Sequence, residues 1–138
     1  MINSPVYTAI PRNQGCTISA ANTGRDGSGT LGTVYTASTN GVPGGSRIDA
    51  LQIAPRGNTT VNVLRFFIYD GTSYHFLGET QIQAATASNT NAVTSITLSQ
   101  ANGTSWLPLL LSSGNSLKVS TNNAETYDVT AIFAGDFS

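Results

Sequence analysis

The sequence predicts an all-β fold, an antiparallel β-sandwich of jelly-roll type with eight or nine strands and an extended N-terminal arm. Three observations support this prediction. Short apolar runs are rich in β-branched and aromatic residues and alternate with polar ones, as in half-buried strands. Turns rich in Gly and Asn separate the runs at short, regular intervals, as in sandwiches and barrels. No segment of useful length carries the apolar stripe of an amphipathic helix.

The stretch from Val61 to Gly71 is the predicted centre of the core. Seven of its first nine residues are apolar. Alternation places Leu64, Phe66 and Ile68 on one face, and Val61, Val63, Phe67 and Tyr69 on the other. Both faces are apolar except at Arg65, so we expect a central strand that is covered on both sides and has at least one residue of the Phe66 face almost fully buried. Asp70-Gly71 then predicts a tight turn into a return strand over residues 74–79.

Shorter runs predict the remaining strands. In chain order they cover residues 16–20, 31–36, 47–54, 92–98, 106–111, 117–120 and 127–133. In the third, alternation predicts Ile48 and Ala50 on one face, with Leu51 and Ile53 on the other. In the last, it predicts that Tyr127, Val129, Ala131 and Phe133 point the same way. Pro108 cannot donate to a ladder, so residues 106–111 are predicted to form an edge strand or a buried loop.

The chain of 138 residues is predicted to form one domain over residues 16–138, preceded by an extended arm over residues 1–15. Pro5 and Pro11 favour extended backbone in the arm. Its apolar residues are more numerous than a free tail needs, and we expect them to bind a partner: Ile2, Val6, Tyr7 and Ile10. The alternative is that the arm folds back as an edge strand of its own domain.

The charge, apolar runs and cysteine content of the sequence argue against several classes of function. Charged residues make up 9% of the chain and the net charge is −1, with no basic cluster, so we expect no nucleic-acid partner. No apolar run approaches the ~20 residues of a membrane span, and the N-terminus does not read as a signal peptide, so we expect synthesis in a cytoplasm and no membrane partner. Cys16 is the single cysteine, which excludes an internal disulfide, and we expect it to act as a small buried hydrophobe.

Residues with catalytic chemistry are sparse. His75 is the one histidine and is expected to face solvent, and the seven carboxylates are scattered singly along the chain. We therefore predict no catalytic, metal-binding or cofactor-binding residues, and a protein that is not an enzyme. A lectin would bind sugar through exposed aromatic side chains, for which Tyr69, Tyr74 and Trp106 are the candidates, although packing is the expected role of each.

Four segments carry a resemblance to a known group of proteins: residues 24–30 (GRDGSGT), 65–71 (RFFIYDG), 122–125 (NNAE) and 135–137 (GDF). Together they resemble small proteins of tailed bacteriophages. The resemblance implies a capsid decoration, or cement, protein of β-sandwich type. Such a protein would sit on the outer surface of the virion, bind the major capsid protein at joints between subunits, and form a dimer or trimer. The alternative is a carbohydrate- or receptor-binding module of a phage tail, fibre or spike.

Overall fold

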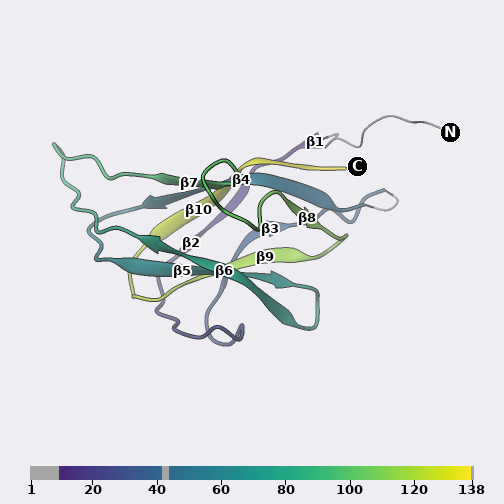
Figure 1. The fold of residues 1–138 in the computed structure, drawn as a ribbon, viewed down its shortest axis with the longest axis horizontal. Helices are drawn as coiled ribbons and strands as arrows, with labels where there is room; N and C mark the ends of the chain where they lie inside the picture. The colour runs from purple at the N-terminus through teal and green to yellow at the C-terminus, as the bar shows by residue number, and fades with distance from the viewer. Residues whose placement is uncertain (1–9, 42–43, 138) are drawn as a thin grey trace.

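Ten strands form two antiparallel sheets in the computed structural model, which describes residues 10–41 and 44–137. The first sheet (sheet A) holds six strands and the second (sheet B) holds four. The two sheets form the two layers visible in Figure 1. In chain order the strands are β1 (Ile10–Pro11), β2 (Gln14–Ile18), β3 (Gly32–Thr36), β4 (Ser46–Pro55), β5 (Asn62–Tyr69), β6 (Tyr74–Ile82), β7 (Ile96–Ser99), β8 (Leu109–Leu111), β9 (Ser116–Thr121) and β10 (Tyr127–Asp136).

The connectivity confirms the predicted jelly-roll sandwich. In sheet A, β10 lies between β4 and the pair β1 and β2, while β7 and β8 both pair with the other side of β4. Sheet B has the order β3, β9, β5, β6. With β1 and β2 counted as one interrupted strand, and β7 and β8 as another, the chain forms eight strands in two sheets, the pattern of a jelly roll.

The predicted central strand is β5, which is paired on both sides, with β9 and with β6. Leu64 and Phe66 are 0% exposed on the face toward sheet A, which confirms the expected burial. Phe67 is 1% exposed on the opposite face. The predicted turn is also present, because Gly71 has a φ of 94° and the Asp70 carboxylate accepts hydrogen bonds from the amides of residues 72 and 73.

Alternation gave the wrong face for several residues of the two long strands of sheet A. Ile48, Leu51 and Ile53 all belong to the core between the sheets, whereas the sequence predicted Ile48 on the face opposite Leu51 and Ile53. Phe133 is 64% exposed, although Tyr127, Val129 and Ala131 in the same strand are fully buried. The reason is a β-bulge, since the register of β10 on β4 shifts between Ala131 and Phe133 and again before Ala134. A bulge adds one residue to a strand and so reverses the faces beyond it.

The Gln14 side chain links the two sheets where β2 of sheet A lies beside β3 of sheet B. The Gln14 amide donates from Nε2 to the Thr36 carbonyl at 3.2 Å and accepts at Oε1 from the Thr36 amide at 2.9 Å. It thereby satisfies both backbone groups of Thr36, an edge-strand residue that would otherwise present them to another chain. β2 begins two residues before the predicted start at Cys16, which places Gln14 inside a strand.

Candidate functional site

Of the four predicted partner-binding residues, the structure describes one. Ile2, Val6 and Tyr7 lie outside the described residues. Ile10 is described, pairs with Asp136 in β10, and is 48% exposed. The described part of the predicted arm, residues 10–15, therefore enters sheet A through β1 and the start of β2, which both pair with β10.

A buried polar cluster holds the chain at this junction. The Asp136 side chain is 4% exposed. It forms an ion pair with Arg12 and accepts a hydrogen bond from Arg12 Nη1 at 2.7 Å. Its other oxygen accepts from the Tyr35 hydroxyl at 2.8 Å and from Ser46 Oγ at 2.5 Å. The Arg12 guanidinium also lies 6.0 Å from the centre of the Tyr35 ring. One carboxylate thus ties together four segments that are distant in sequence.

The cluster shifts the pKa of two of its members in opposite directions. Burial alone would raise the pKa of Asp136, but the hydrogen bonds from Arg12, Ser46 and Tyr35 and the charge of Arg12 outweigh it and lower that pKa. Burial, together with the hydrogen bond to Asp136, raises the pKa of Tyr35 to about 12. Asp136 is therefore ionised and Tyr35 protonated at neutral pH, the state in which all three donors are satisfied.

Two large apolar side chains lie exposed on the outer face of sheet A near this junction. Leu110 is 65% exposed, and its neighbours Leu109 and Leu111 are buried on the inner face. Phe133 is exposed to nearly the same extent, and because β10 is paired on both sides, its side chain points outward from the sheet. The registers align Leu110 with Arg47, Arg47 with Gly135, and Gly135 with Pro11, in one row across the sheet. We call Leu110 and Phe133 the sheet A apolar pair.

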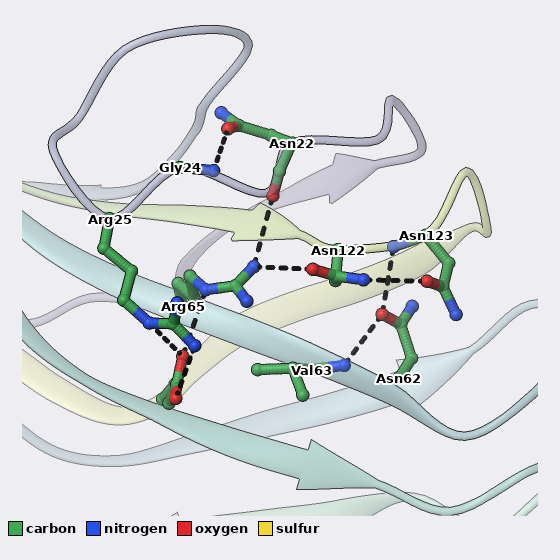
Figure 2. A network of polar contacts seen from close by, with 9 residues as sticks. Asn22, Gly24, Arg25, Asn62, Val63, Arg65, Asn122 and Asn123 are labelled. Atoms are coloured by element: carbon green, nitrogen blue, oxygen red, sulfur yellow. Dashed lines mark hydrogen bonds and ion pairs between the residues drawn. The ribbon is translucent and has the colours of Figure 1, made fainter.

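A second polar cluster lies on the outer face of sheet B, beneath the segment between β2 and β3. Arg65 is 4% exposed, and Figure 2 shows its guanidinium directed at Asn22 and Asn122. Its Nη1 donates to the Asn22 carbonyl at 3.3 Å and to Asn122 Oδ1 at 3.1 Å, while Nε donates to Glu79 at 3.0 Å. This explains how a charged residue fits in a strand that is otherwise apolar on both faces.

The segment over Arg65 is itself held by side chains. Asn22 Oδ1 accepts from the Gly24 amide, as drawn in Figure 2, and its Nδ2 donates to the carbonyls of residues 28 and 30. Arg25 adds two hydrogen bonds of 3.1 Å to Glu79. The hydrogen bond from Arg25 is the largest influence on Glu79 and lowers its pKa, against a smaller effect of burial. The glycine-rich stretch 24–30 therefore packs over the outer face of sheet B, and hydrogen bonds within the chain hold it there.

The other residues with catalytic chemistry also make contacts within the protein. All seven carboxylates of the sequence accept hydrogen bonds from the chain's own donors. His75 is exposed, as expected, and its Nε2 lies 2.9 Å from Asp70 Oδ2 in the β5–β6 turn. Cys16 is partly buried against the core, and burial raises its pKa to about 11.

The described residues include neither a group of metal ligands nor a membrane-spanning helix. Within residues 10–41 and 44–137, no three His, Cys, Asp or Glu side chains are grouped so that they could hold a metal ion. In the same ranges, no helix has the length and apolar character needed to cross a bilayer.

Comparison with protein-family models, with curated proteins and with solved structures found no match to this chain. We therefore infer a functional site in this chain from the geometry of the structure alone. Sequence reasoning named Ile10 as a candidate and did not name Leu110 or Phe133. Leu110 sits in a run of three leucines, where composition does not show which one faces solvent. The alternation of β10 assigned Phe133 to the core, and the bulge that turns it outward has no signature in the sequence.

Proposed function

We propose that this chain is a non-enzymatic structural protein of a phage virion, which decorates the outer capsid surface by binding the major capsid protein at joints between subunits. The observation that carries the proposal is the sheet A apolar pair, which is exposed on the outer face of the sheet that β1 joins. Both side chains are exposed on the outer face of sheet A, with β4 and its Arg47–Asp49 ion pair between them. Large apolar side chains exposed on one face can contribute to a surface that binds another protein. Extended segments can add contacts along a neighbouring subunit, and this is the role that the proposal gives to residues 1–9.

The proposal combines three further features. The surface carries few charges, which suits a protein that packs against other protein. The carboxylates hold strands and loops together within the chain. The jelly roll is an architecture that viral capsid domains use, although a fold alone does not assign a function. We further propose that the protein acts as a dimer or trimer on the particle, where each copy contributes one arm and one apolar pair.

Occupancy on purified capsids that lack this protein tests the proposal. We expect Phe133→Ser, Leu110→Ser and a deletion of residues 1–9 each to weaken capsid binding by at least ~10-fold, because central apolar contacts carry most of the free energy of an interface. The deletion ends before Ile10, so it leaves β1 and the Arg12–Asp136 ion pair in place. The two substitution variants should melt as the wild type does, since the side chains that they change are exposed.

The matched control is Phe76→Ser, which removes a phenylalanine that is 43% exposed on β6 of the other sheet. We expect this variant to bind capsids as well as the wild type. Full occupancy by the Phe133, Leu110 and deletion variants would contradict the proposed docking surface. Electron microscopy of virions separates capsid decoration from the alternative of a tail or spike module, because density confined to the tail would contradict decoration.

Salt dependence gives an independent prediction for the wild-type protein. With few charges and an apolar contact surface, capsid binding should change less than ~3-fold between low and physiological ionic strength, because salt mainly screens exposed charges. Arg47 and Asp49, which lie within the same face, already form an ion pair of 2.8 Å with each other. Binding isotherms at several salt concentrations provide the measurement, and a steep loss of affinity would indicate an electrostatic interface instead.

A further inference from the structure

A cavity of about 300 Å³ lies between the edge strand β6 and the loop that joins β7 to β8. Strand residues 77–80 and loop residues 102–106 form most of its wall. Its volume is at the small end of the range for ligand pockets, ~300–1,000 Å³. The cavity is separate from the sheet A apolar pair, whose residues do not line it.

The apolar part of the wall consists of Phe66, Leu77, Leu98 and Trp106. Trp106 is partly buried, and its ring centre lies 5.1 Å from that of Phe66 with the planes tilted by 40°. Gly78 makes room for the indole, because a β-carbon at this position would lie 3.2 Å from Trp106 Nε1. The wall thus offers an indole fixed in place by its neighbours.

Backbone hydrogen bonds support the loop around Trp106. The amides of Asn102 and Thr104 both donate to the Ser99 carbonyl, and the Leu107 amide donates to the Thr104 carbonyl. The Asn102 side chain adds a bond of 2.9 Å to the carbonyl of Thr97 in β7. A ligand entering the cavity would therefore meet a preformed wall, which lowers the entropic cost of binding.

The polar part of the wall has unused hydrogen-bonding capacity. Within the part of the chain that the structure describes, no hydrogen bond is made by Trp106 Nε1 or by the hydroxyls of Thr80, Thr104 and Ser105. Glu79 is the one ionisable residue in the wall, and Arg25 and Arg65 already neutralise its carboxylate. The cavity therefore presents neutral donors and acceptors beside aromatic and aliphatic carbon.

We propose that this cavity binds a neutral sugar ring. A pyranose has an apolar face of C–H groups, which suits the indole and the leucine side chains, and a rim of hydroxyls, which suits the threonine and serine hydroxyls. A phosphorylated ligand would find no unpaired cation in the wall, and a purely apolar ligand would leave the polar groups without partners. The inference does not rest on the proposed capsid function, since the two sites use different residues.

The single tryptophan of the sequence is Trp106, so intrinsic fluorescence reports directly on this cavity. The experiment titrates the full-length protein with glucose, galactose, mannose and N-acetylglucosamine at millimolar concentrations, with saturation-transfer NMR as a second readout. We expect a saturable change in emission for at least one sugar. Thr104→Val should weaken its binding by up to ~10-fold, because the variant removes one hydrogen bond while keeping the shape of the side chain.

Two further variants distinguish specific binding from a general effect on the protein. Trp106→Phe, followed by NMR, should weaken binding at least as much as Thr104→Val, whereas Thr72→Val in the β5–β6 turn should leave it unchanged. Melting curves establish that each variant is folded. An absence of saturable binding for every sugar tested would overturn the inference, and so would a folded Thr104→Val and a folded Trp106→Phe that both retain wild-type affinity.

Discussion

Truncating Phe66 to alanine is expected to lower the free energy of unfolding by ~3–5 kcal/mol, the usual cost of emptying a buried aromatic site. Phe66 is fully buried in β5, the strand that both β6 and β9 need as a partner. Its ring also supports Trp106. The surrounding strands are fixed by their ladders and can collapse only partly into the space that the ring leaves.

Chemical denaturation followed by circular dichroism measures this loss. The matched control is Phe76→Ala, in which a partly exposed phenylalanine on the neighbouring strand is truncated. The control should lose less stability, because much of its ring already lies in water. A loss below ~1 kcal/mol for Phe66→Ala would mean that the site does not behave as core, against its burial.

Replacing Asp136 by asparagine is expected to cost ~2–4 kcal/mol, because an amide cannot accept from all three of the donors that now point at the carboxylate. Tyr35 and Ser46 are buried, so a hydroxyl that loses its acceptor there cannot turn to water. Arg12 is 43% exposed and would be resolvated, which keeps the loss below that of a fully buried pair. The control Asp49→Asn, which breaks an exposed pair with Arg47, should cost less than ~1 kcal/mol.

The same carboxylate gives a pH dependence of defined sign. Because the pKa of Asp136 is lower in the folded state, its contribution to stability is complete above the unfolded pKa of ~3.9. The contribution is lost as the pH falls through the folded pKa. Unfolding free energies measured from neutral pH into this acidic range should therefore fall more steeply for the wild type than for Asp136→Asn. Parallel curves for the two proteins would show that Asp136 does not titrate with a lowered pKa.

The sequence predicted the fold well because its central signals are local. The apolar run of β5 and the Asp70-Gly71 turn each depend on a few adjacent residues, and both predictions were confirmed. The faces of β4 and the position of Phe133 were predicted wrongly. Alternation assumes an unbroken strand, and a bulge arises from how two strands fit together.

The candidate site was harder to predict, since its residues meet only in the folded chain. Arg12, Tyr35, Ser46 and Asp136 come from four segments, and no spacing in the sequence relates them. Arg65 stood out as a charge in an apolar strand, yet its partner Asn22 reaches it through a loop that folds back over the sheet. The cavity beside Trp106 likewise depends on Gly78, whose role becomes apparent only when the indole lies against it.

The position of β10 has a consequence for how the protein is made. This strand, latest in sequence among those described, lies inside sheet A and supplies the partners of β1, β2 and one side of β4. Sheet A therefore cannot close on the ribosome until Asp136 has left the exit tunnel, and until then β4 presents an unpaired edge. Strand pairings between such distant segments form slowly, because the long intervening loop must close first. During synthesis the nascent chain is thus exposed to aggregation for longer than a protein built from neighbouring hairpins would be.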